Sequence, residues 1–267
     1  MILPTILSGE HLSYAVGHKY LLTDIDLTVP QGTFAAIIGP NGAGKTTLLN
    51  LLDGDNKPTA GKVFFGGEVL SSIDRLQLAQ QRAVLPQLGQ VPFAVIARDI
   101  IALGREPYRY DARQNHNRRI IEHCMEQMDI VDLANNHYST LSGGEQHRVQ
   151  IARTLAQIYS EPDADLSGKI LFLDEPTNHL DIRHQYSLMQ LLKQLQKAGL
   201  TIIAVMHDLS LTLQFAEQII LLNKGKKFGD YSPQSLVKSD ALSKVYQMAM
   251  TIRRDKDSGR YLLIPDL

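Results

Sequence analysis

A glycine-rich segment, GPNGAGKTT at residues 39–47, constrains the fold of this chain more than any other feature. It contains the pattern G-x-x-x-x-G-K-[ST], with Gly39, Gly44, Lys45 and Thr46 at the fixed positions. The apolar run AAIIG precedes it and a segment typical of a helix follows, which is the expected context of strand, loop and helix. Glycines let successive backbone N–H groups face phosphate oxygens, and the helix N-terminus adds its positive dipole end. The sequence therefore predicts a phosphate-binding loop in an α/β fold.

Two side chains of this loop have specific tasks in phosphate chemistry. Lys45 supplies a point charge for the β- and γ-phosphates, and the Thr46 hydroxyl is suited to Mg²⁺. The other loop residues count as candidate nucleotide contacts: Pro40, Asn41, Gly42, Ala43 and Thr47. Average glycine usage gives the pattern by chance in roughly one such chain in a hundred, so we predict ATP and Mg²⁺ as ligands.

The strand pattern indicates two kinds of sheet. The runs AAIIG, ILFLD and TIIAVM, at residues 35–39, 170–174 and 201–206, are continuously apolar, which is typical of parallel strands buried on both faces. A segment typical of a helix follows each run, as in a parallel sheet covered by helices. Residues 21–30 and 63–70 instead come close to alternating, which favours a half-exposed antiparallel sheet.

Helical spacing replaces these strand signals between residues 95 and 157. An apolar face there predicts packing rather than a cofactor site, and it consists of Ile120, Ile121, Cys124, Met125 and Met128. We predict a single domain over residues 1–267. Its core comprises residues 1–90 and 160–250 with an N-terminal antiparallel part, residues 91–159 form a helical subdomain, and residues 251–267 are a C-terminal tail without an assigned role.

Composition excludes several classes of function. The net charge is −1, with 27 Lys and Arg against 28 Asp and Glu, so no basic field is available for nonspecific nucleic-acid binding. Cys124 is the single cysteine, which excludes an intrachain disulfide and fits a reducing cytosol. No apolar run approaches the roughly 20 residues needed to cross a bilayer, and the N-terminus lacks signal-peptide features. We therefore expect any membrane work to be done by a partner.

The segment ILFLDEP ends a predicted buried strand with two acids. Ligands of open parallel sheets bind at this carboxyl end, so Asp174 and Glu175 are expected beside the phosphate loop. Their tasks are separable, because Asp174 can hold the Mg²⁺ shell while Glu175 polarises the attacking water as general base. Alone, such an acid pair also fits a solvated turn, and the phosphate loop favours the catalytic interpretation.

The segment LSGGEQ, at residues 141–146, precedes an amphipathic helical run. Ser142 with Glu145 has the spacing of a capping box, for which helix initiation is a sufficient explanation. The cap does not need Gly143 and Gly144, and exposed glycines at a helix N-terminus make a second phosphate-facing surface. Two such surfaces in one chain predict a dimer.

In their order, GPNGAGKTT, LSGGEQ and ILFLDEP resemble the Walker A, signature and Walker B motifs of ABC ATPases, and the resemblance covers nearly the whole chain. It implies a P-loop NTPase (RecA-like) core with a mainly parallel sheet, an antiparallel β subdomain and an ABC-type helical subdomain. Four further positions match family motifs in the expected order: Gln87 in VLPQ (the Q-loop), Asp181 in NHLD (the D-loop), His207 in MHD (the switch histidine) and Tyr14 in LSYAVG (the aromatic residue that stacks on adenine).

The resemblance also implies a mechanism that needs two chains. Each ATP would lie between the phosphate loop of one copy and the signature of the other, with Ser142 and Gly144 at the γ-phosphate. His207 would support the reacting phosphate, and Gln87 would serve both catalysis and the metal. Gly143, Glu145 and Asp181 complete the implied nucleotide contacts. The implied partners are a second copy, a membrane permease dimer and, through it, a substrate-binding protein, at the cytoplasmic face of a bacterial inner membrane and without nucleic acid.

The segment GREPY, residues 104–108, resembles ATPases that serve importers of iron chelates, haem and cobalamin, although it also fits a helix ended by Pro107. The surroundings of the signature and Walker B motifs are most similar to ATP-binding subunits of haemin importers. The resemblance implies an ATPase that energises haem uptake, with ferric siderophore or cobalamin as the alternative cargo. The motor need not touch its cargo, so we expect no haem ligand here.

Three other functions stay open. Asn178 and His179 stand where haemin importers more usually carry Ser-Ala, and EPTNHLD is similar to soluble ABC proteins that act on ribosomes. Those proteins carry two cassettes, whereas this sequence has one phosphate loop and one signature. A regulatory subunit without turnover is disfavoured by the joint presence of Glu175, Gln87 and His207. An exporter ATPase is usually fused to membrane helices, and the absence of a sufficiently long apolar run in this sequence disfavours that alternative.

Overall fold

The computed structural model describes residues 3–85, 95–109, 114–162, 164–255 and 259–265. Compactness divides the chain into two units. Unit 1 comprises residues 1–72 and 201–267, and unit 2 comprises residues 73–200. Gln87 lies outside the described residues, so its predicted role is not addressed by the structure.

The central strands of unit 1 form a mainly parallel sheet in the order β10-β9-β3-β8. β3 pairs in parallel with β8 and β9, while β10 is antiparallel to β9. Every residue of β3 and β8 is buried, which confirms that the continuously apolar runs are strands covered on both faces. The bounds are β3 (Phe34–Ile38), α1 (Lys45–Leu52), β8 (Thr201–Val205), α7 (Leu209–Phe215), β9 (Gln218–Asn223) and β10 (Lys226–Tyr231).

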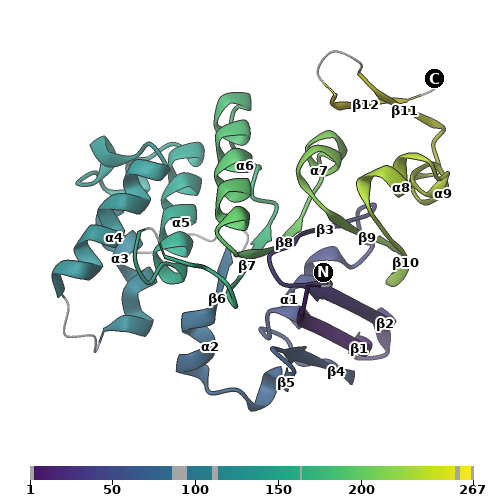
Figure 1. The fold of residues 1–267 in the computed structure, drawn as a ribbon, viewed down its shortest axis with the longest axis horizontal. Coiled ribbons are helices and arrows are strands. Elements are labelled where there is room, and N and C mark those ends of the chain that lie inside the picture. The colour runs from purple at the N-terminus through teal and green to yellow at the C-terminus, as the bar shows by residue number, and fades with distance from the viewer. Residues whose placement is uncertain (1–2, 86–94, 110–113, 163, 256–258, 266–267) are drawn as a thin grey trace. The chain divides into compact units, whose positions relative to one another are not determined.

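Unit 1 also contains the predicted antiparallel sheet, in the order β2-β1-β4-β5, whose first three strands lie side by side in Figure 1. Leu22, Ile25, Leu27 and Val29 on β2 are buried while most residues between them are exposed or half-buried, as the alternation predicted. The bounds are β1 (Thr5–Val16), β2 (Lys19–Pro30), β4 (Ala60–Phe65), β5 (Glu68–Val69) and the 3₁₀ turn η1 (Leu70–Ser72).

The end of unit 1 consists of two short helices and a pair of strands. After α8 (Pro233–Val237) and α9 (Ala241–Tyr246), the tail forms an antiparallel hairpin of β11 (Met250–Arg254) and β12 (Tyr261–Pro265). Met250 pairs with Pro265, and Arg254 pairs with Tyr261. The sequence left the role of residues 251–267 open, because the stretch is short and follows the last predicted helix.

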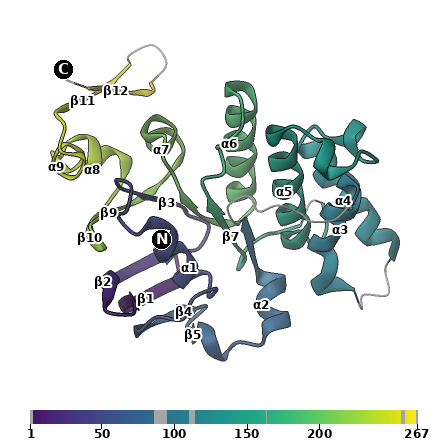
Figure 2. The ribbon, with the colours of Figure 1, turned by 180° about the vertical axis from the view of Figure 1, so that it is seen from behind.

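Unit 2 joins two parallel strands to a group of helices. β6 pairs in parallel with β7, and all five residues of β7 are buried. Figures 1 and 2 show α3, α4 and α5 beside one another. The bounds are α2 (Arg75–Gln81), β6 (Arg82–Leu85), α3 (Ala97–Ala102), η2 (Leu103–Tyr108), α4 (Gln114–Gln127), η3 (Val131–Leu133), η4 (Tyr138–Thr140), α5 (Gly143–Ile158), β7 (Ile170–Asp174) and α6 (Ile182–Lys197).

The Met and Cys face of α4 packs into this helical group. Ile120, Cys124 and Met125 are buried, Met128 is 5% exposed, and Ile121 is half-buried. Burial raises the pKa of the Cys124 thiol far above its usual range, so the thiol stays protonated and unreactive. The face is a packing surface. Among the described residues, none of the helices has the length and apolarity that a membrane span requires.

Candidate active site

The backbone conformation of the phosphate loop in unit 1 requires glycine at two positions, Gly39 and Gly44. Gly39 has φ 152° and Gly44 has φ 97°, and both values lie in the region that favours glycine. A Cβ at Gly39 would lie 2.4 Å from the Leu222 carbonyl oxygen, and one at Gly44 would lie 2.6 Å from Leu22 Cδ2. The neighbouring strands thus press directly on the loop, which fixes its path at the end of β3.

Lys45 begins α1 and turns its side chain back into the loop. Its Nζ donates to the carbonyl oxygens of Gly39 at 3.0 Å and Pro40 at 3.2 Å, and the residue is 7% exposed. Gly44 provides no side-chain cap for α1, and the first N–H groups of a helix have no intrahelical partner. The loop therefore places an ammonium group and a helix N-terminus together, which is the arrangement that binds phosphate.

Two other candidates of unit 1 are connected to this loop. β3 and β8 run in parallel with Ile37 opposite Val205, so His207 follows β8 at the edge where β3 enters the loop. His207 is exposed there. Tyr14 on β1 pairs with Leu22 on β2, and Leu22 is the residue that packs on Gly44. Tyr14 is half-buried one strand away from the loop.

Tyr246 at the end of α9 is a contact of the loop that the sequence did not indicate. The backbone of Gly39 hydrogen-bonds to the Tyr246 hydroxyl, and burial raises the pKa of Tyr246. The hydrogen bond to Gly39 acts against this rise, as expected for a backbone N–H that donates to the phenolic oxygen, and it connects α9 to the start of the phosphate loop. A single tyrosine in a short C-terminal helix carries no pattern that distinguishes it from a core residue.

In unit 2, the two predicted acids occupy different environments at the end of β7. Asp174 is the last residue of the strand and is 5% exposed. Glu175 follows with φ 52°, a left-handed conformation that is uncommon for a residue with a side chain. Asn178 Nδ2 donates to Glu175 Oε2, and the Asn178 N–H donates to the Glu175 carbonyl oxygen at 3.1 Å. The turn thus holds both the backbone and the carboxylate of Glu175.

The strained backbone of Glu175 is typical of a functional site. Left-handed conformations of non-glycine residues cost of order 1–3 kcal/mol and cluster at functional sites. His179 in the same turn also has a positive φ, 61°. Asn178 entered the sequence argument only as a departure from a pattern, whereas the structure gives it a direct contact with the candidate base.

The signature segment begins α5 with a complete capping box. The Ser142 N–H donates to Glu145 Oε2 at 2.7 Å, and the Glu145 N–H donates to Ser142 Oγ at 3.4 Å. Hydrogen bonds from the Ser142 side chain and backbone lower the pKa of Glu145. The structure therefore confirms that Ser142 and Glu145 initiate α5, and this role does not explain Gly143. Apart from Gly143, its two chain neighbours and the adjacent backbone of α5, no described atom lies within 4 Å of a Cβ built on Gly143. Packing against the described residues therefore does not require a glycine there.

Contacts within unit 2 attach the signature helix to the turn after β7. A Cβ on Gly144 would lie 3.0 Å from the His179 carbonyl oxygen. His147 is 3% exposed, and its Nε2 lies 2.8 Å from the Pro176 carbonyl oxygen. Burial lowers the pKa of His147, so the neutral imidazole can donate Nε2–H to that carbonyl. A histidine on an amphipathic helix gave no sequence signal for this role.

Asp181, the D-loop candidate, caps α6. Its Oδ1 accepts the His184 N–H at 2.9 Å, and this hydrogen bond is the main reason that the pKa of Asp181 is lowered. Nη1 of Arg148 on α5 lies 2.6 Å from Nε2 of His184. Unit 2 therefore brings together the strand-end acids, the signature and Asp181, whereas unit 1 brings together the phosphate loop, His207 and Tyr14.

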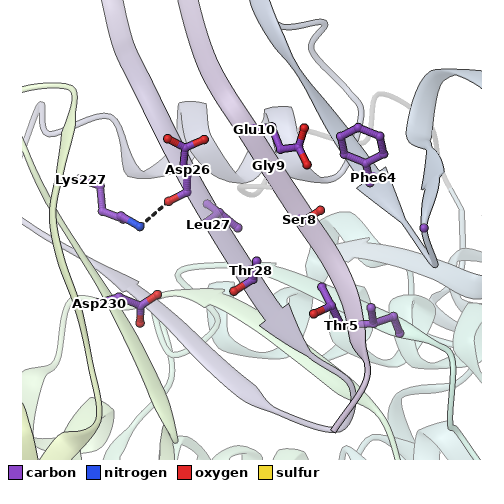
Figure 3. A pocket seen from close by; sticks show the side chains of 12 residues that line it. Thr5, Ser8, Gly9, Glu10, Asp26, Leu27, Thr28, Phe64, Lys227 and Asp230 are labelled. Atoms are coloured by element: carbon purple, nitrogen blue, oxygen red, sulfur yellow. Dashed lines mark hydrogen bonds between the residues drawn. The ribbon is translucent and has the colours of Figure 1, made fainter. Parts of the chain in front are cut away.

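A separate open pocket of about 660 Å³ lies between the antiparallel sheet and β10 (Figure 3). Glu10, Asp26, Asp230 and Lys227 are among its lining residues, and Lys227 Nζ donates to the Asp26 carbonyl oxygen. Of the predicted site residues that the structure describes, none lines this pocket. Its size alone assigns it no part in the chemistry of the phosphate loop.

Comparison with known proteins agrees with this geometry. The family described as ABC transporter matches residues 22–178. The hemin import ATP-binding protein HmuV of Rhodopseudomonas palustris (strain HaA2) is 36% identical and covers 98% of each chain. HmuV of Escherichia coli O157:H7 is 37% identical, covering 98% of this chain and all of that protein, 100%.

Solved structures show the same fold. An inward-facing putative metal-chelate type ABC transporter has a TM-score of 0.80 at 24% identity, covering 99% of this chain and 98% of that one. The ATP-binding cassette MJ0796, a dimer in a post-hydrolysis state with ADP and Pi, has a TM-score of 0.74 at 29% identity. That alignment covers 85% of this chain and 99% of MJ0796.

Proposed function

Because this chain belongs to the ABC transporter family and is an ATP-binding ATPase of it, we propose that it energises haem uptake through a separate membrane permease. The observation that carries this proposal is the alignment with HmuV proteins at 36–37% identity over nearly the full length of both chains. The phosphate loop, the signature and the strand-end acids all lie within that alignment. The GREPY segment supports the same importer group.

Unit 1 supplies the groups that hold the nucleotide. Tyr14 stacks on adenine, and backbone N–H groups of residues 39–47 surround the phosphates. Lys45 leaves the loop carbonyls that it now contacts and binds the β- and γ-phosphates. His207 supports the reacting phosphate from the end of β8. These groups position and neutralise charge, which is most of what phosphoryl transfer asks of a protein.

Oxygen donors in the sequence fit Mg²⁺. Thr46 and Asp174 offer a hydroxyl and a carboxylate, the hard ligands that this ion prefers, and Gln87 is the third proposed ligand. When bound, Mg²⁺ neutralises charge on the phosphate oxygens. Glu175 receives a proton from the attacking water. Asn178 holds the Glu175 carboxylate in place for that transfer.

Hydrolysis requires two copies in this proposal. Ser142, Gly143, Gly144 and Glu145 of one chain complete the ATP site of the other, together with Asp181. Two findings support this arrangement: no described atom packs against a Cβ built on Gly143, and the MJ0796 cassette is a dimer. Residues 1–267 act as one ATPase domain, with 91–159 as its helical subdomain. The dimer docks on a permease dimer at the cytoplasmic face of the membrane, and a substrate-binding protein delivers cargo to that permease.

The cargo is tested by reconstituting this chain with the permease and binding protein of its neighbouring genes. We expect haemin to stimulate ATP hydrolysis more than a ferric siderophore, cobalamin or no cargo, measured as steady-state phosphate release. Stimulation by another cargo alone would keep the motor and overturn haem. Hydrolysis that no permease changes would favour a soluble ABC ATPase, which the EPTNHLD segment also resembles, and no hydrolysis at all would favour a regulatory subunit.

Replacing Tyr14 by alanine is expected to weaken MgATP binding by roughly 1 to 3 kcal/mol, the scale of base stacking on aromatic side chains. Isothermal titration calorimetry measures the change directly. Tyr20→Ala is the matched control, because Tyr20 lies on the neighbouring strand and is 63% exposed. Unchanged affinity in Tyr14→Ala would assign adenine to another residue.

A further inference from the structure

The C-terminal end of α5 is closed by side chains from three other parts of unit 2. Arg105 Nη1 donates to the carbonyl oxygens of Ala156 at 2.5 Å and Tyr159 at 2.6 Å. The Tyr108 hydroxyl donates to the Gln157 carbonyl oxygen at 3.1 Å. Lys169 Nζ donates to the Ile158 carbonyl oxygen at 2.6 Å, and His116 Nε2 contacts the Ser160 carbonyl oxygen. The last carbonyls of a helix lack intrahelical partners, so these contacts replace solvent at a buried helix end.

Arg105 is the central element of this closure. The residue is 4% exposed, and its guanidinium lies 3.9 Å from the centre of the Tyr108 ring. Its Nε donates to Asn117 Oδ1 at 2.9 Å. A cation is favourable at a helix C-terminus, where the dipole is negative, but burying it is costly unless its donors are used. The buried guanidinium of Arg105 therefore fixes the C-terminal end of α5.

The GREPY segment cannot shift along α5 independently. A Cβ on Gly104 would lie 2.1 Å from the Arg153 carbonyl oxygen, so the backbones are in direct contact. Gln80 Nε2 donates to the Pro107 carbonyl oxygen at 3.0 Å, which ties the segment to α2 as well. Residues 104–108 and the end of α5 thus form one packed body.

The opposite end of the same helix carries the signature. Ser142 caps α5, and His147 attaches it to Pro176 beside the candidate base. The 16 residues of α5 span about 24 Å at 1.5 Å per residue. A rigid helix held at its far end transmits the orientation of that end, so the closure at Arg105 helps to set where the signature lies.

We propose that Arg105 is a positioning residue for ATP hydrolysis, acting through α5 on the signature at Ser142. It touches neither nucleotide nor reacting atoms. This inference rests on the proposed function in one respect, the contribution of the signature to hydrolysis. It requires no particular permease or cargo.

The test compares Arg105→Gln and Arg105→Lys with wild type in the full chain, measuring kcat and KM for ATP, MgATP affinity by calorimetry and amide exchange of residues 141–146. We expect Arg105→Gln to lower kcat 10- to 100-fold, on the order of what a displaced catalytic geometry costs, while KM and affinity stay within about twofold. Its signature amides should exchange faster. Arg105→Lys keeps a buried donor and should recover most of kcat.

Two further variants keep the test decisive. Tyr108→Phe removes one hydroxyl donor without removing the ring, so it should fold even if Arg105→Gln does not, and should lower kcat about two- to threefold by a small loss of alignment. Arg118→Gln is the matched control, because Arg118 is an exposed arginine on α4 that pairs with Glu122 at 3.0 Å. It should behave as wild type.

Wild-type kcat in both Arg105→Gln and Tyr108→Phe would overturn the proposal. A second outcome would also overturn it: kcat falls only in proportion to the fraction of protein that is folded and binds nucleotide, and amide exchange changes only near residues 156–160. In that case Arg105 would stabilise the end of α5 without affecting the signature. Full activity of Ser142→Arg, measured in parallel, would instead show that the signature is not needed, which is a failure of the proposed function.

Discussion

Glu175→Gln is expected to stop ATP turnover while MgATP binding persists. The substitution removes the carboxylate that we propose as acceptor of a proton from the attacking water, and it leaves Asp174 and the phosphate loop unchanged. A positioned general base contributes about 10²- to 10⁴-fold, so phosphate release should fall by that order. Glutamine is nearly isosteric, and Asn178 can still hydrogen-bond to its side-chain oxygen.

The trapped state gives a second measurement of the same variant. Because ATP remains intact, closed dimers should accumulate, and size exclusion in MgATP should show a dimer that wild type does not retain. Glu126→Gln is the control, since Glu126 is an exposed acid on α4 in the same unit. Hydrolysis at the wild-type rate by Glu175→Gln would assign the base to another group.

The sequence predicted the fold well where one pattern has one physical cause. The apolar runs within β3, β7 and β8 are uninterrupted because both faces of each strand are covered, and every residue of the three strands is buried. The alternation on β2 likewise has a single explanation, one face packed and one face open. The C-terminal hairpin has neither pattern, and its pairing of Met250 with Pro265 could not be predicted.

For the candidate site too, the sequence predicted only the residues that belong to a local pattern. Motifs with fixed spacing predicted Lys45, Glu175 and Ser142 as site residues, because phosphate chemistry requires those groups at those spacings. The sequence did not predict residues whose contacts in this region join positions distant along the chain. Arg105 and Tyr159 are separated by 54 positions, and His147 and Pro176 by 29. Nothing in the local sequence distinguishes such an arginine or histidine from one on a solvated surface.

Ser142→Arg is expected to abolish turnover while the affinity of the single chain for MgATP stays within about twofold, since the phosphate loop lies in the other unit of the same chain. In the proposed dimer, the new side chain would occupy the space where the γ-phosphate held by a second copy enters. Loss of a positioned donor alone costs about 10²- to 10³-fold, and added bulk should cost at least that much.

A second effect of this substitution must be separated from the first. Ser142 also caps α5, and loss of an N-cap destabilises a protein by about 0.5–2 kcal/mol. Ser142→Ala removes the cap and the donor without adding bulk, so it should lower the unfolding midpoint as much as Ser142→Arg and lose only the donor's share of activity, about 10²- to 10³-fold. Ser139→Arg adds the same bulk at an exposed position three residues earlier and should hydrolyse ATP normally.

Mixing variants then tests whether the signature acts on the partner's ATP. A dimer of one Ser142→Arg chain and one Lys45→Ala chain contains one site with both defects and one with neither. If the signature acts across the interface, the intact composite site should restore measurable phosphate release that neither variant shows alone. If the signature acted within its own chain, both sites of every mixed dimer would be defective and mixing would restore nothing. Full activity of Ser142→Arg by itself would exclude the shared site altogether, because an arginine at Ser142 and a phosphate entering from a second copy cannot occupy the same space.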